Sequence, residues 1–113
     1  NPVSKKDLKK YENIVFISYG NCLEKENIDF QNEYKKEKNE LPGTVAYYAY
    51  DSVNLIMEAI KKSGFDRDKL QNSLLNIHYK GITGLIHFDD KGNRLGNIGF
   101  MEIKNGVPVA LKK

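Results

Sequence analysis

The stretch from Tyr79 to Arg94 constrains the fold most strongly, because it holds a glycine-flanked turn, a short strand and a hairpin in one short segment. Gly81 and Gly84 permit backbone angles that a side chain would forbid. Residues 89–93, Asp-Asp-Lys-Gly-Asn, predict a chain reversal, since Asp and Asn side chains bond nearby backbone groups. The apolar side chains of the segment are expected to be buried, and they are Ile82, Leu85, Ile86 and Phe88.

Apolar runs elsewhere predict further strands. Residues 13–18, Asn-Ile-Val-Phe-Ile-Ser, form a continuous β-branched run that is typical of a parallel strand buried on both faces. The end of the chain predicts strands at 84–88, 97–104 and 107–111. Asn105-Gly106 between the last two predicts a two-residue hairpin turn of type I′.

Capping signals predict the helices. Ser4 can cap a short turn through Lys10, although Asp7 stands where a capping box has Glu or Gln. Asp29 can begin a surface helix to about Asn39. The longer predictions are a central helix from Thr44 to Ser63, closed by Gly64, and a third helix from Asp66 or Asp68 through Ile77.

The central helix carries a broad apolar face. We expect Ala49, Val53, Ile56 and Ile60 to form its buried side, with Tyr50 continuing the stripe. Tyr47 and Tyr48 stand near the start of the helix, where their rings can either pack in the core or wall an apolar pocket and orient a polar ligand.

Composition describes an ordinary globular chain that we treat as one domain, residues 1–113. Hydrophobic residues make up 40% and charged residues 29%, which excludes a disordered chain. The net charge of +3 comes from lysines interleaved with acidic residues, so no one-signed patch for nucleic acid is expected. Cys22 is the single cysteine, so stability must come from packing.

No constellation for catalysis or metal binding is found. His78 and His87 lack the close spacing that preorganises zinc ligands. Cys22 has no base near it in the sequence, and Gly92, Gly96 and Gly99 lack the dinucleotide-binding pattern. We therefore expect a protein that is not an enzyme and that needs no cofactor or metal.

Two blocks carry a family resemblance. The segment from Tyr79 to Arg94, continued by LGNIGFMEIKNGVPV at 95–109, resembles the C-terminal end of periplasmic binding proteins for branched-chain amino acids. The block PGTVAYYAYDSV at 42–53 resembles that family's Pro-loop and the helix that follows it with Tyr-Asp before an apolar run. The likeness covers roughly Asn13 to Val109, about the last third of a usual member.

The resemblance implies the C-terminal portion of a two-lobed type I solute-binding protein, a three-layer α/β fold with a parallel strand, three helices and C-terminal hairpin strands. Family members hold a ligand between two lobes and deliver it to the membrane permease of an ABC importer. The implied ligand is a branched-chain or similar amino acid, and the implied location is periplasmic or extracellular, with a lipid anchor on the intact protein left open. The alternative is the extracellular sensing domain of a receptor, such as a sensor kinase or chemoreceptor.

The resemblance also bears on the site. The family places an aromatic ligand contact at the start of the central helix, at the position that matches Val45. The candidate ligand contacts are therefore Val45, Tyr47 and Tyr48, together with Tyr19 at the end of the first predicted strand. Most polar contacts to such a ligand would come from segments that this sequence lacks.

Association is a further expectation. If the strand Ile14 to Ile17 and the helix Val45 to Ile60 pack against segments that this chain lacks, strand edges and apolar surface are left exposed. A symmetric homodimer or higher oligomer would cover them, with a total interface above roughly 1,200 Å².

Overall fold

The computed structural model describes residues 4–19, 24–96 and 98–111. In chain order the elements are α1 (Lys5–Leu8), η1 (Lys9–Tyr11), β1 (Val15–Tyr19), α2 (Lys25–Lys38), α3 (Thr44–Ser63), α4 (Arg67–Leu75), β2 (Tyr79–Gly81), β3 (Gly84–Phe88), β4 (Arg94–Leu95), β5 (Ile98–Lys104) and β6 (Val107–Ala110). The predicted α/β class, with three longer helices and a C-terminal hairpin, is confirmed.

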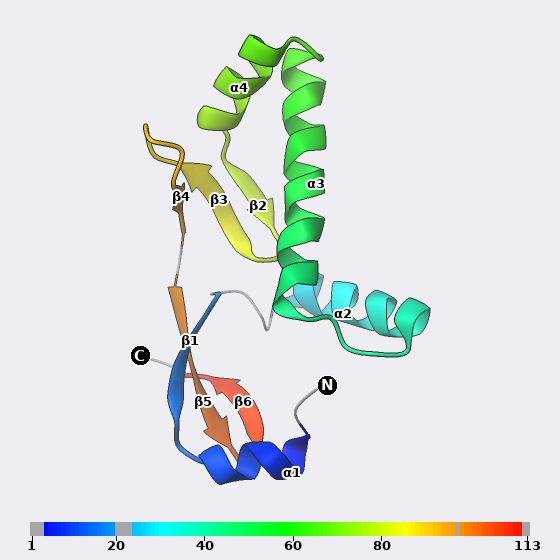
Figure 1. Ribbon diagram of the computed structural model, residues 1–113, viewed down its shortest axis with the longest axis vertical. Helices are drawn as coiled ribbons and strands as arrows, with labels where there is room; N and C mark the ends of the chain where they lie inside the picture. The colour runs from blue at the N-terminus through cyan, green and yellow to red at the C-terminus, as the bar shows by residue number, and fades with distance from the viewer. Residues whose placement is uncertain (1–3, 20–23, 97, 112–113) are drawn as a thin grey trace.

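The molecule is elongated, with extents of 51 × 34 × 22 Å. One end holds α3, α4 and the sheet β2-β3-β4, and the other end holds α1 and the sheet β1-β5-β6 (Figure 1). α2 lies beside the first turns of α3. The chain therefore passes from one end of the molecule toward the other between β1 and α2, and it has returned at β5, which follows β4.

Helix ends follow the predicted capping chemistry at three places. The Ser4 hydroxyl accepts a hydrogen bond from the Asp7 N–H at 3.2 Å, and an Asp66 carboxylate oxygen accepts one from the Lys69 N–H at 2.9 Å. Gly64 follows α3 with a φ of 70°, a left-handed angle that favours glycine. These short-range bonds fix where α1, α3 and α4 begin or end.

The predicted start of α2 at Asp29 is wrong, because the helix already begins at Lys25. Lys25 lies one turn before Asp29, and its Nζ stands 2.6 Å from the Asp29 carboxylate. Opposite charges four residues apart favour helix in that turn, so Asp29 supports the helix from inside instead of capping it.

The predicted parallel strand is also wrong: β1 pairs antiparallel with β5, from Val15 opposite Glu102 to Tyr19 opposite Ile98. β1 is an edge strand of its sheet, and Ile17 is 68% exposed. A continuous apolar run indicates a strand, but it fixes neither the direction of pairing nor burial on both faces.

Both predicted turns are confirmed. Asn105 and Gly106 join β5 to β6 with φ angles of 53° and 70°, and a type I′ turn requires positive φ at both positions. In the reversal between β3 and β4, one Asp89 carboxylate oxygen accepts hydrogen bonds from the N–H groups of Lys91 and Asn93.

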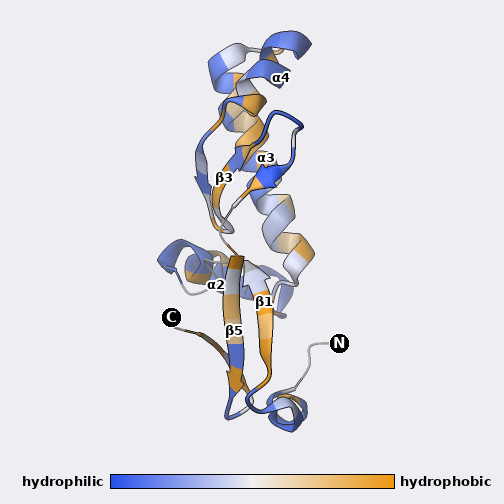
Figure 2. Ribbon diagram, turned by 90° about the vertical axis from the view of Figure 1, so that its left-hand side faces the viewer, coloured by the Kyte–Doolittle hydropathy of each residue, from blue (hydrophilic) through white to orange (hydrophobic). Residues whose placement is uncertain are grey.

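The hydrophobic core lies between α3, α4 and β3. Its buried members are Leu55, Ala59, Ile77 and Ile86, and Leu70, Leu74, Tyr79 and Phe88 pack against them. Figure 2 shows hydrophobic residues gathered on β1, β3 and β5, whereas α2 is mainly hydrophilic.

The predicted buried face of α3 is wrong within this chain. Val53 is 59% exposed, Ile56 is 45% exposed, and Ala49 and Tyr50 are also exposed. The helix instead turns its flank, Leu55 and Ala59, toward α4 and β3. The helical spacing of apolar residues predicts that a helix has an apolar face, but the elements packed against the helix decide which part of a broad face is buried.

Leu85 is another exception to the predicted core, because it is 42% exposed while its neighbour Ile86 is buried. Successive residues of a strand point to opposite faces of the sheet. Leu85 and Ile86 in β3 therefore cannot both point toward the core.

Candidate ligand-binding cavity

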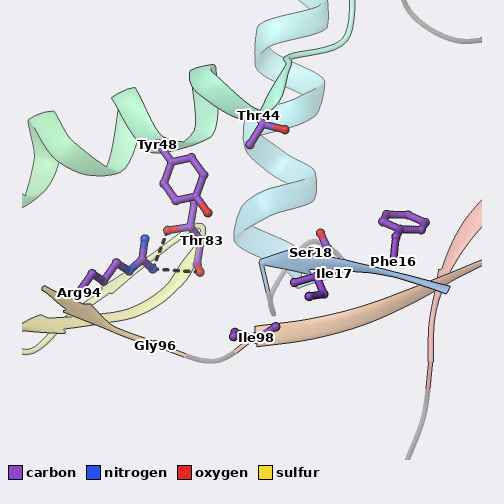
Figure 3. Close-up of a pocket in the computed structure, with 9 residues that line it drawn as sticks. All are labelled: Phe16, Ile17, Ser18, Thr44, Tyr48, Thr83, Arg94, Gly96 and Ile98. Atoms are coloured by element: carbon purple, nitrogen blue, oxygen red, sulfur yellow. Dashed lines mark hydrogen bonds between the residues drawn. The ribbon is translucent and has the colours of Figure 1, made fainter.

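A cavity of about 560 Å³ lies where the two groups of elements meet. Its wall is formed by β1, the start of α3, the β2–β3 turn and the β4–β5 segment (Figure 3). The lining residues are Phe16, Ile17, Ser18, Thr44, Tyr48, Thr83, Arg94, Gly96 and Ile98. Residues from distant parts of the sequence thus share one small space.

The β2–β3 turn is held by the buried carboxylate of Asp51 on α3, which is 2% exposed. Its oxygens accept hydrogen bonds from the Ile82 N–H and the Thr83 N–H, both at 2.8 Å, and from the Thr83 hydroxyl at 2.5 Å. A Cβ atom on Gly81 would stand 2.5 Å from the carboxylate. Glycine at 81 is therefore required by lack of space, whereas Gly84 has a φ of 104° and supplies the predicted freedom of angle.

α2 holds the same turn from a second direction. Asn27 is fully buried, and its Nδ2 donates to the Ile82 carbonyl at 2.9 Å. Gln31, one turn later, donates from Nε2 to the Asn27 Oδ1 at 2.7 Å. Asp51 and Asn27 together tie the hairpin turn to two helices, so Thr83 has a fixed position in the cavity wall.

Sequence reasoning missed both of these residues. Asp51 carried a signal, since it is a single carboxylate among apolar neighbours on a helix with an otherwise apolar face. A charge in such a place requires hydrogen-bonding partners. Asn27 carried no comparable signal, because α2 is polar along most of its length and nothing marks one of its amides as buried.

Arg94 places its guanidinium group at the polar end of the cavity. Nη2 donates to the Thr83 carbonyl at 3.2 Å and to the Thr83 hydroxyl oxygen at 3.0 Å. The guanidinium carbon lies 5.8 Å from the centroid of the Tyr48 ring, within the range of a cation–π interaction. Because the Thr83 hydroxyl donates to Asp51 and accepts from Arg94, one hydroxyl connects the buried carboxylate to the cavity.

The cavity has two chemically different ends. Arg94, Thr83 and Tyr48 lie on one side, while Phe16, Ile17 and Ile98 lie on the other (Figure 3). Among the described residues that line it, Arg94 is the only charged one. Such a space suits a small molecule with an apolar part and an anionic or strongly polar group.

A second cavity of about 370 Å³ has the opposite charge. Glu26, Asp29 and Glu33 on α2 and Asp51 line it, beside Tyr79. Burial raises the pKa of the Tyr79 hydroxyl, and the negative charge of Asp51 raises it further. In the described part of the chain, no three His, Cys, Asp or Glu side chains are grouped so that they could hold a metal ion.

Comparison with known proteins identifies the family. The profile of the family described as "Receptor family ligand binding region" matches residues 2–104, which is most of the chain. The chain belongs to this family. The family is a ligand-binding family and not a family of enzymes, in agreement with the expectation from the sequence.

Solved structures support the same assignment. The branched-chain amino acid transporter substrate-binding protein of Streptococcus pneumoniae, in complex with isoleucine, is 30% identical with a TM-score of 0.72, over 91% of this chain and 31% of that one. An ABC transporter substrate-binding protein of Desulfitobacterium hafniense, in complex with leucine, is 24% identical with a TM-score of 0.75, over 91% and 32%. A solute-binding protein of Rhodopseudomonas palustris, in complex with 3,4-dihydroxybenzoic acid, is 25% identical with a TM-score of 0.73, over 83% and 27%.

The chain spans 27% to 32% of the length of these structures. No curated protein was found to be similar to it. None of the helices in the described ranges is both long enough and apolar enough to cross a bilayer.

The predicted ligand contacts of this receptor-family chain are placed as follows. Tyr48 lines the cavity and is 42% exposed. Tyr47 is 7% exposed and packs against the Phe30 ring, with centroids 5.4 Å apart, so it lies in a core position. Val45 is 81% exposed and is not among the lining residues. Tyr19 ends β1, and its side chain, like Cys22, lies outside what the structure describes.

Proposed function

We propose that this chain forms one wall of the ligand cleft of a solute-binding protein that serves an ABC importer. The observation that carries the proposal is the cavity between the β1–β5 strands and the α3–hairpin unit, which is polar at one end and apolar at the other. A cleft between two structural units is the usual place for a small ligand. In this proposal, residues 1–113 are the C-terminal portion of a two-lobed protein, and the opposite wall comes from the part that the chain does not span.

The proposed ligand is a branched-chain or similar amino acid. The solved relatives are named as complexes with leucine, isoleucine and 3,4-dihydroxybenzoic acid. These molecules share a carboxyl group and an apolar part, which match the two ends of the cavity. Of the four predicted ligand contacts, Tyr48 has the position that best supports a contact with such a molecule.

The proposed partner of the intact protein is the importer's membrane permease, and the proposed location is the periplasm or the outer surface. Support comes from relatives named as periplasmic binding and ABC transporter proteins. Because one wall supplies only part of the contacts, we expect the chain alone to bind leucine, isoleucine or valine weakly or not at all.

One observation favours a second candidate, the extracellular ligand-sensing domain of a receptor. The matched family is described as a receptor ligand-binding region, a description that does not specify transport. Flanking genes separate the two candidates: permease genes nearby indicate an importer, and a kinase or chemotaxis domain in the same polypeptide indicates a sensor.

A chimera tests the proposed function. The matching third of the S. pneumoniae isoleucine-binding protein is replaced by this chain, and isoleucine binding is measured by calorimetry. We expect one site per chimera with saturable binding. A matched chimera carrying Asp51→Ala should bind more weakly, because its β2–β3 turn is no longer held. A chimera that melts cooperatively but binds neither isoleucine nor leucine would contradict the proposal.

A further inference from the structure

The guanidinium group of Arg94 has hydrogen-bond donors that no described residue uses. A guanidinium group carries five N–H donors, and here only Nη2 is engaged, by the two oxygens of Thr83. The donors on Nε and Nη1 have no acceptor among the residues that the structure describes. Gly96 leaves Nε open, because even a Cβ atom at that position would stand 3.6 Å from it.

The charge of Arg94 is also not paired directly. Its guanidinium makes no ion pair with a described residue, and the described residues that line the cavity include no carboxylate. The Asp51 carboxylate is linked to the Arg94 guanidinium only through the Thr83 hydroxyl, which forms a hydrogen bond with each of the two groups. That carboxylate already accepts three hydrogen bonds, so it stabilises the arginine from behind without occupying its free donors.

The guanidinium is held in place before any ligand arrives. Thr83 fixes Nη2, and Asp51 and Asn27 fix Thr83 through the turn. The Tyr48 ring lies on a further side of the group. A cation held in this way keeps its free N–H donors on Nε and Nη1 in fixed directions, and a hydrogen bond from a charged donor to a carboxylate is shorter and stronger than one between neutral groups.

The rest of the cavity suits the remainder of such a ligand. Phe16, Ile17 and Ile98 form an apolar side opposite the cation. Thr44 is the first residue of the 20-residue helix α3 and lines the same space. The partial positive charge at that helix end adds to the field of Arg94.

We infer that Arg94 is the residue of this chain that binds the ligand's carboxylate, and that it makes the cavity select carboxylates over neutral analogues of the same shape. The inference rests on the proposed function, because it concerns the same cavity. It assigns a role that the four sequence-predicted contacts did not include.

The test uses the 113-residue chain and nuclear magnetic resonance of arginine Nε–H groups. The chain has two arginines, and Arg67 is exposed on α4 away from the cavity, so it serves as an internal control. Benzoate and the isosteric neutral benzamide are titrated to roughly 50 mM at constant ionic strength, a range suited to one-walled, millimolar binding. We expect benzoate to shift the Arg94 signal and benzamide to leave it nearly unchanged, with Arg67 unaffected by both.

Two variants and one control variant sharpen the test. Arg94→Gln should lower the affinity for benzoate, followed through the backbone signals of Thr44 and Ile98, by roughly tenfold and bring it close to that for benzamide. Gly96→Val keeps the charge but places a side chain against Nε, and should weaken benzoate binding without a change in net charge. Arg67→Gln should change neither affinity.

Each outcome decides the inference. Equal shifts of Arg67 and Arg94, equal affinities for benzoate and benzamide, or no shift at Arg94 at the highest concentration would overturn it. A benzoate preference that survives in Arg94→Gln would overturn it as well. Isoleucine binding by the chimera is an independent readout of the proposed function. The chimera can bind isoleucine even if Arg94 does not bind the carboxylate. If the chimera does not bind isoleucine, the preference of the 113-residue chain for benzoate over benzamide still tests the role of Arg94.

Discussion

Replacing Asp51 with alanine should strongly destabilise the chain, because Asp51 holds the β2–β3 turn that forms part of the cavity wall. The substitution removes the acceptor of three hydrogen bonds and leaves two backbone N–H groups and the proton of the Thr83 hydroxyl without an acceptor in a buried region. Hydrogen bonds to a charged group contribute about 1.5–3 kcal/mol each. Water entering the vacated space restores part of this, so we expect a net loss of about 3–5 kcal/mol.

That loss is large beside the total stability of a small domain, which is about 5–15 kcal/mol. Urea unfolding followed by circular dichroism should show a midpoint well below that of the wild type, or a chain that is largely unfolded without urea. Asp51→Asn keeps the size and one acceptor but turns an amide N–H toward a donor, so it should fall between the two.

Asp90→Ala is the matched control, because Asp90 is exposed in the β3–β4 reversal and its side chain makes no hydrogen bond or ion pair with described residues. It should change stability by less than about 0.5 kcal/mol. If Asp51→Ala unfolds within that same margin of the wild type, the turn is not held by Asp51 and the argument for a preset cavity wall is refuted.

Four further outcomes are expected. In a dilute solution of the monomer, Val53→Asp should leave the free energy of unfolding nearly unchanged. Leu55→Asp should lower it by about 3–5 kcal/mol, because Leu55 is 7% exposed in the core. Equal effects would show that the wrong face of α3 has been assigned to the core. The hydrogen bond from the Asn93 side chain, with the neighbouring backbone donors, holds the pKa of Asp89 below its ordinary value. This turn therefore contributes stability at pH values above the pKa of Asp89 in the unfolded chain, and that stability is lost as the pH falls through the pKa of Asp89 in the folded chain. Asn93→Ala should raise the pKa of Asp89 in a titration followed by nuclear magnetic resonance, and an unchanged pKa would contradict this. Calorimetry should detect no tight binding of leucine, isoleucine or valine to the chain alone, and micromolar affinity would mean that the pocket is complete. Light scattering at micromolar concentration should give a dimer or larger species through the exposed apolar side chains of β1 and α3, and a clean monomer mass would rule this out.

Local chemistry could be predicted from the sequence because its causes lie within a few residues. Ser4 and Asp66 cap helices, Gly64 ends α3, and Asn105-Gly106 turns the last hairpin as predicted. Each of these depends on one side chain and the backbone beside it, so no knowledge of the rest of the fold was needed.

Long-range arrangement could not be predicted in the same way. The antiparallel pairing of β1 depends on β5, which lies far along the chain, and the exposed position of Val53 depends on which elements pack on α3. The candidate site shows the same limit. Tyr48 was predicted from its position at a helix start, but Arg94 reaches the cavity only because Asp51 and Thr83 bring the β2–β3 turn against α3.

The location of the ligand in the isoleucine-binding chimera tests the central claim most directly. A crystal structure of the chimera grown with isoleucine should place the ligand against the cavity formed by β1, the start of α3 and the β2–β3 turn, with its carboxylate beside the Arg94 guanidinium and its side chain toward Ile17 and Ile98. Isoleucine bound with no atom in contact with Tyr48, Thr83 or Arg94 would contradict the claim that this cavity is a wall of the binding site.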